Sequence, residues 1–267
     1  MFFLGALVAQ LVLTVGTTLT TLGGTGVSIV FGGPGVEYGA AWERLADLPT
    51  PRHGLAAAAI DGKLYVVGGE KRALWLFEQR ALDRYDPATN AWEHLRPMPT
   101  RRYDMAAAVI DGRLYVVGGY DNRTPLAVLE RYDPGTDQWE RLADMPTPRY
   151  GIGAAVLGRK LYVVGGWDAQ RNAVAVLECY DPQTDTWESL AGMPTARANL
   201  AAAEINGALI AVGGDHGMYT AEVYDPVGDS WTELPPLMRP WSSMTAAVIG
   251  GCLYIVGGET TWTVLAR

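Results

Sequence analysis

Aromatic and acidic side chains follow two short motifs that recur along this chain. One motif is a proline-containing stretch that ends in arginine, as in PTPRHG, PTRRYD and PTARAN, and the other is a pair of glycines. With RPWSS taken as the fifth copy, the residues after the arginine motif are His53, Tyr103, Tyr150, Asn199 and Trp241. The residues after the glycine pairs are Glu70, Tyr120, Trp167, Asp215 and Glu259. Aromatic rings beside carboxylates suit an arginine or lysine side chain, or a sugar stacked on a ring, so we predict these ten residues to bind a ligand.

The residue types give little support for a metal site or for a catalytic nucleophile. The chain has three histidines, His53, His94 and His216, and we expect His94 to be solvated on an outer strand. Two remaining histidines are too few for a histidine-rich metal site. The sequence has no Gly-x-Ser-x-Gly elbow and no phosphate loop with a lysine. We therefore expect no metal, no cofactor and no catalytic residue.

One enzymatic alternative stays open at the same positions. The carboxylates of Glu70, Asp215 and Glu259 have the chemistry of a glycosidase pair or of an epimerase base. Such a role would require a raised pKa in that cluster.

Both motifs frame a stretch that the chain repeats five times. AAAAIDGKLYVVGG at residues 56–69 is followed by close copies at 106–119, 153–166, 201–214 and 245–258. A run of small residues, a tight turn, a β-branched and aromatic run and a glycine pair predict a β-hairpin. Because the two strands are antiparallel, the second ends on the face where the first begins. The two motif positions should therefore share one face.

The repeat unit is longer than this hairpin. Four copies are followed by Tyr-Asp-Pro and, seven residues after the tyrosine, by a tryptophan. Successive tryptophans from Trp42 to Trp231 are 44 to 50 residues apart, which predicts an array of β-repeats. Asp-Pro suits a type I turn, and the left-handed position after it falls on Asn90, Asp137, Asp185 and Asp229.

The double glycine, the Tyr-Asp-Pro and the spaced tryptophan together resemble the kelch repeat. The resemblance implies an all-β fold, a kelch-type β-propeller of four-stranded blades. It also implies a site, since residues at these two motif positions line the channel mouth in kelch domains that bind partner proteins. Kelch-like sugar epimerases exist, whereas kelch-type copper oxidases need a tyrosine–cysteine cross-link with histidine ligands, and no such cluster surrounds Cys179. Kelch propellers often follow BTB and BACK domains; nothing before Thr14 is long enough for these, so we expect an adaptor role only if the chain is a fragment.

The blade boundaries follow from the repeats. We predict six blades, at about residues 14–45, 52–95, 101–142, 149–190, 197–234 and 239–267. The last lacks a fourth strand, so residues 1–13 are expected to close it, since an open edge would leave backbone groups unpaired. These residues carry no charge and are alternatively a targeting segment, in which case five blades are expected.

Composition limits the partners. A net charge of −8 disfavours nucleic acid, and no membrane partner is expected unless residues 1–22 are an anchor. The protein should be cytoplasmic if residues 1–13 form a strand and exported if they are a signal. Cys179 and Cys252 should be buried free thiols, and the repeated arginines should hold loop carbonyls or an acid of the adjacent blade. We therefore predict a non-catalytic scaffold that binds a protein or peptide, with a carbohydrate-active enzyme or lectin, or a purely structural repeat, as alternatives.

Overall fold

The computed structural model describes residues 44–72, 76–215, 219–237, 242–249, 251–260 and 263–264. The predicted first blade and the closing strand at residues 1–13 therefore lie almost entirely outside the described residues. Within the described residues no helix is long and apolar enough to cross a membrane.

Four sheets of four antiparallel strands repeat along the chain. The first holds β1 (Ala56–Ile60), β2 (Lys63–Val67), β5 (Leu82–Asp86) and β6 (Ala91–Leu95). The second holds β7 (Ala106–Ile110), β8 (Arg113–Val117), β9 (Leu129–Asp133) and β10 (Gln138–Arg141). The third holds β11 (Gly153–Leu157), β12 (Lys160–Val164), β13 (Leu177–Asp181) and β14 (Thr186–Leu190). The fourth holds β15 (Ala201–Ile205), β16 (Ala208–Val212), β17 (Ala221–Asp225) and β18 (Ser230–Leu234).

The remaining strands form two smaller sheets. A short hairpin of β3 (Glu70–Arg72) and β4 (Leu76–Glu78) follows the first glycine pair. A three-stranded sheet holds β19 (Ser242–Ile249), β20 (Cys252–Thr260) and β21 (Thr263–Val264). Val264 was expected in a third strand like β9, but it pairs with Glu259, beyond the glycine pair. Val264 therefore lies opposite Glu259 in the way that β4 lies opposite Glu70 in the first unit. This is possible because β20 continues beyond its glycine pair.

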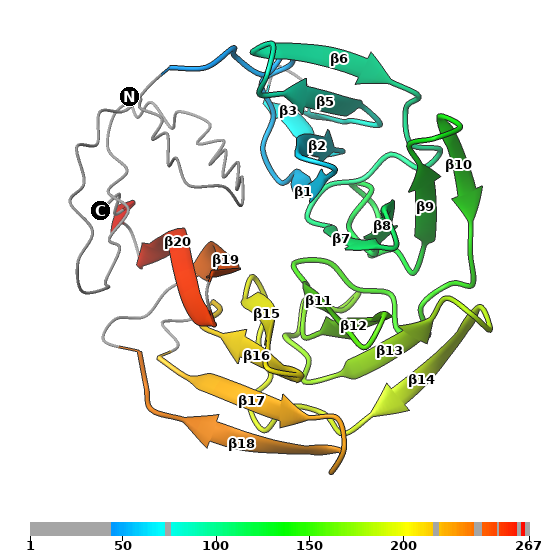
Figure 1. The fold of residues 1–267 in the computed structure, drawn as a ribbon. Coiled ribbons are helices and arrows are strands. Elements are labelled where there is room, and N and C mark those ends of the chain that lie inside the picture. Colours follow the sequence, from blue (N-terminus) through cyan, green and yellow to red (C-terminus); the bar gives the residue numbers. More distant parts are fainter. Residues whose placement is uncertain are drawn as a thin grey trace.

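The sheets are arranged around a common axis (Figure 1). The alanine-rich strands β1, β7, β11, β15 and β19 are innermost, and β6, β10, β14 and β18 lie on the circumference. Small residues suit the crowded inner position: a Cβ built on Gly153 would lie 2.8 Å from the Cβ of Ala202 in the neighbouring inner strand.

The hairpin turns form because their residues accept left-handed backbone. Asp61 and Gly62 have φ of 49° and 72°, and Asp111 and Gly112 have 51° and 71°, as a type I′ turn requires. The predicted left-handed residue after Asp-Pro is also confirmed, with φ of 49° at Asn90 and 52° at Asp137.

The core lies between neighbouring sheets. Val67 and Leu82 of the first sheet pack with Leu114, Val116 and Tyr132 of the second, and all five are at most 1% exposed. The second strands are buried on both faces because each sheet is covered on both sides, whereas the outer strands alternate between exposed and half-buried residues.

Both cysteines are free thiols, as predicted. Cys179 is buried in β13, and burial raises the pKa of its thiol to about 11. Cys252 is exposed, contrary to prediction, because it is the first residue of β20, directly after the turn.

Candidate functional site

The two motif positions are paired by backbone hydrogen bonds in the first three units. The Glu70 N–H donates to the carbonyl of His53 at 2.8 Å, and the His53 N–H donates to Glu70 at 3.0 Å. Tyr120 and Tyr103 are bonded in the same way, at 2.8 and 3.1 Å. Trp167 and Tyr150 follow at 2.8 and 3.3 Å. For these three units, the hairpin argument that placed both positions on one face is confirmed.

The fourth unit keeps the position directly after the arginine, so the predicted Asn199 is one residue off, and in the fifth unit the paired residue lies two places later. The Asp215 N–H donates to Ala198 at 3.0 Å, so Ala198 is the partner and Asn199 lies one residue further on. The Asn199 side chain nevertheless contacts the site residue Asp215, because its Nδ2 donates to Asp215 Oδ2 at 2.6 Å. In the fifth unit Ser242 pairs with Glu259, of which the structure describes the backbone. Trp241 and His216 lie outside the described residues.

A belt of backbone hydrogen bonds joins the units at this face. Each member has φ between 51° and 60°, and the members are Gly54, Asp104, Gly151, Asn199 and Ser243. The N–H of each of the last four donates to the carbonyl of the member before it, at 2.7 to 2.9 Å. Only glycine and short polar residues adopt this conformation readily, which explains their types. Sequence reasoning missed Asp104; its signal was a glycine, aspartate or asparagine two residues after each of the first four arginines.

Aromatic rings run across two neighbouring units. The rings of Tyr103 and Tyr120 meet edge to face, with centroids 5.8 Å apart and planes at 75°. Tyr120 also packs on Tyr150 of the next unit, with centroids 4.8 Å apart. Trp167 continues the row through its pairing with Tyr150, and all four residues are half-buried.

Two acids beside this row stabilise loops. Asp121 Oδ1 accepts the N–H groups of Arg123 and Thr124, at 3.0 and 2.8 Å. Asp168 Oδ1 accepts those of Gln170 and Asn172, at 2.9 and 2.8 Å. Backbone donors hold the pKa of Asp168 below its usual range.

The other half of the face is acidic. His53 Nε2 lies 2.7 Å from Glu70 Oε1, and Glu70 is 9% exposed. Burial, together with the charges of Glu70 and Asp215, raises the pKa of Asp104 to about 6 against an opposing effect of His53. The raised pKa thus falls on Asp104. We call these residues the rim: His53, Glu70, Tyr103, Asp104, Tyr120, Tyr150, Trp167, Asn199 and Asp215.

The four motif arginines that the structure describes are structural, as expected. Arg102 is buried and donates to the carbonyls of Val128 and Gly118 at 2.7 and 3.1 Å, and to Glu130 Oε2 at 2.7 Å. Thr100 Oγ1 holds the other oxygen of Glu130 at 2.7 Å. Glu130 is in β9 of the same sheet, so the expected partner in an adjacent blade was wrong. The backbone carbonyl of Arg102 instead reaches the adjacent unit, accepting the Gly69 N–H at 3.0 Å.

His94 is also paired rather than merely solvated. Its ring is 70% exposed, and Nδ1 lies 2.5 Å from Oδ1 of the buried Asp83. Asp83 is the residue that ion-pairs with Arg52, at 2.6 Å, in the place that glutamates take in the next three sheets. His94 therefore belongs to the scaffold of the first sheet.

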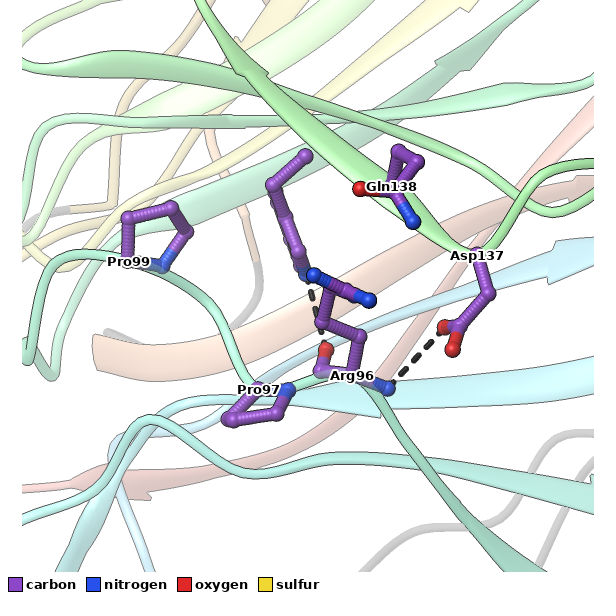
Figure 2. Close-up of a pocket in the computed structure, with 6 residues that line it drawn as sticks. Arg96, Pro97, Pro99, Asp137 and Gln138 are labelled. Atoms are coloured by element: carbon purple, nitrogen blue, oxygen red, sulfur yellow. Dashed lines mark hydrogen bonds between the residues drawn. The ribbon is translucent and has the colours of Figure 1, made fainter.

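A groove of about 580 Å³ lies at the outer edge, between the first two sheets. Figure 2 shows Arg96, Pro97, Pro99, Asp137 and Gln138 around it. The Arg96 N–H donates to Asp137 Oδ1 at 3.0 Å, and Trp139 Nε1 donates to the Arg96 carbonyl at 2.8 Å. The same two bonds recur at the other junctions of the outer strands, around Ala46, Ala143 and Ala191. We therefore interpret the groove as part of the packing between units. Among the described residues no group of three His, Cys, Asp or Glu side chains is arranged to hold a metal ion.

Comparison with known proteins agrees with this architecture. Residues 96–258 match the family described as "KLHDC2/KLHL20/DRC7 Kelch-repeats domain", and residues 51–99 match the "Kelch motif". The chain belongs to the kelch-repeat family.

Two individual proteins illustrate the kelch relationship. "Kelch-like ECH-associated protein 1B" of Danio rerio is 49% identical over 51 residues, which are 19% of this chain and 9% of that protein. The matched segment thus spans less than a tenth of that relative. A solved structure described as "Structure of YjhT" superposes with a TM-score of 0.77 and 21% identity, covering 85% of this kelch chain and 83% of the other. At that identity the likeness shows the fold.

Proposed function

We propose that this kelch chain is a non-catalytic binding scaffold that recognises a protein or peptide at the rim. The observation that supports this most is the pairing of the two motif positions, which brings side chains of three sheets onto one face. Tyrosines and aspartates that hold the units together recur in type, as Tyr132 and Tyr180 do, whereas rim positions differ from unit to unit. Variation on a constant backbone is what a specific binding surface needs.

We also propose the finer architecture. Residues 14–267 would form a six-bladed propeller, in which a strand from residues 1–13 closes the last blade. The support is the four complete sheets, the start of a further one in β19 and β20, and the hairpin-like pattern of residues 14–33. Five blades are the alternative if residues 1–13 are removed as a targeting segment.

The rim proposal is tested with Tyr120→Ala and Trp167→Ala. Each removes a half-buried ring from the rim, so binding of a partner captured on the immobilised wild-type protein should weaken by about tenfold or more. Val227→Ala, at a position 94% exposed in an Asp-Pro turn, is the control and should bind as wild type. The melting temperature of each variant is measured by circular dichroism. Undiminished partner binding by both rim variants would overturn the proposal.

One observation favours the enzymatic alternative, a carbohydrate-active role. A carboxyl group with a pKa of about 6, as in Asp104, suits proton transfer near neutral pH. Turnover of a sugar that is lost in Asp104→Asn, with an unchanged melting temperature, would favour that alternative over binding.

A further inference from the structure

The acidic half of the rim holds a buried oxygen that accepts no hydrogen bond. Glu70 Oε1 is paired with His53, but Oε2 is buried and has no hydrogen-bond partner in the part of the chain that the structure describes. A buried carboxylate oxygen without a donor costs free energy, and such oxygens mark places where a donor is expected. Glu70 is nine-tenths buried, so bulk water satisfies it poorly.

Two further carboxylates act on the same place from other sheets. Asp104 Oδ1 would lie 2.6 Å from a Cβ on Gly54, so its carboxylate lies against the unit that carries Glu70. Asp215 comes from the fourth sheet, where it is bonded to Asn199. Both Glu70 and Asp215 raise the pKa of Asp104, so the Asp104 carboxylate is repelled by each of them. An incoming cation would relieve this repulsion.

We propose that this acidic half binds one guanidinium or ammonium group of a peptide ligand, with Glu70 Oε2 accepting its hydrogen bond. Asp104 and Asp215 supply the remaining negative charge, and the rings of Tyr103 and Tyr120 offer cation–π contact at the side. Arginine fits better than lysine because its planar group donates to several carboxylates at once. This inference rests on the proposed function, since it names the ligand group that the rim takes.

The site has a built-in pH dependence. The groups that act on Asp104 are Glu70, His53 and Asp215, and Asn199 holds Asp215. Protonation of Asp104 near pH 6 removes a negative charge from the site. This weakens the binding of a cation, so affinity should fall as the pH drops from 7.5 to 5.

The probe is a peptide that is selected for binding to the wild-type protein. A displayed library of random peptides is selected on the wild-type protein, and the bound peptides are synthesised twice, once unchanged and once with every arginine replaced by citrulline and every lysine by norleucine. Citrulline keeps the shape of arginine without its charge. We expect the charged peptides to bind at least about tenfold more tightly than their neutral copies.

Variants then locate the cation. Glu70→Gln should weaken the charged peptide by about 10- to 100-fold and leave the neutral copy unaffected. Asp104→Asn should remove most of the pH dependence, and it should fold because asparagine already occupies this belt position at Asn199. His53→Gln removes the ion pair with Glu70 Oε1. Glu188→Gln, on the exposed face of β14, is the matched acidic control.

The outcomes separate this inference from the proposed function. Selected peptides that bind equally well without charge, yet are lost in Tyr120→Ala, would overturn the cation site and leave the binding rim in place. Peptides that keep full affinity in Glu70→Gln would overturn it in the same way. If no selected peptide is affected by any rim variant, the binding function fails and the cation site with it.

Discussion

At the scale of single residues, the structure explains why the first position of each glycine pair is glycine. Gly118 has φ of 64°, and a Cβ there would lie 2.7 Å from the carbonyl oxygen of Arg149 in the next unit. Gly165 faces the carbonyl of Arg197 in the same way, at 2.4 Å. The first residue of a pair must therefore be glycine for two reasons: its backbone is left-handed, and a neighbouring carbonyl leaves no room for a Cβ.

This predicts a large cost for Gly118→Ala. Left-handed backbone costs alanine about 1–2 kcal/mol, and the clash with Arg149 adds about 1–3 kcal/mol. Gly112→Ala is the control, because Gly112 has φ of 71° and open space around it, so it carries the first cost alone. Urea unfolding measures both free energies. Equal losses in the two variants would contradict the steric explanation.

At the scale of elements, neighbouring sheets are latched at their outer edge. Asp137 Oδ1 accepts the Arg96 N–H from the loop of the preceding unit and the hydroxyl of Tyr132 at 2.8 Å. These donors hold the pKa of Asp137 below its usual range. Asn90 makes the same two bonds, to Ala46 and Tyr85, both at 2.8 Å. The latch needs an oxygen on a short side chain that tolerates left-handed backbone, and it does not need the charge.

We therefore expect Asp137→Ala to lower the free energy of unfolding by about 1–3 kcal/mol, since the hydroxyl of the buried Tyr132 and the Arg96 N–H lose their acceptor. Asp137→Asn should lose much less, because Asn90 shows that an amide oxygen suffices. Since the pKa of Asp137 is lowered on folding, its ionic contribution is present above its unfolded pKa and declines as the pH falls below about 4. Urea titrations at pH 7 and pH 3.5 measure this; an asparagine variant as unstable as the alanine one would contradict it.

Sequence reasoning reached the elements better than the details of the site. Period, hairpins and turn residues were predictable because local backbone preferences set them, as the left-handed Asn90 shows. Asp215 was expected opposite Asn199, but its backbone partner is Ala198, directly after Arg197 as in the first three units. The side-chain bond from Asn199 to Asp215 was not predictable, since it is a tertiary contact. Asp104 was missed because its raised pKa arises from burial and from Glu70 and Asp215, which tertiary contacts alone bring near.

At the scale of the whole molecule, the units share one buried tyrosine each on the third strand. Burial, followed by a hydrogen bond to an aspartate, raises the pKa of Tyr132, Tyr180 and Tyr224. In the unfolded chain these hydroxyls ionise at about pH 10. The unfolded state therefore releases protons first as the pH rises, and the stability that is fully present below pH 10 is progressively lost above it.

We expect cooperative alkaline unfolding of the whole protein above about pH 10. Phenolate absorbance at 295 nm and the circular dichroism of the sheets, recorded across pH 8 to 12, should change together for these tyrosines. Complete tyrosine ionisation at pH 10 with an intact fold would contradict the expected protection.

A backbone belt holds the units together at the binding face, so this task does not depend on the side chains that would bind a ligand. The belt runs through Gly54, Asp104, Gly151, Asn199 and Ser243. Its bonds run from amide to carbonyl, so cohesion at this face is independent of which side chains the paired positions carry. An engineer could randomise Tyr103 with Tyr120, or Tyr150 with Trp167, and screen for new specificities without rebuilding the frame.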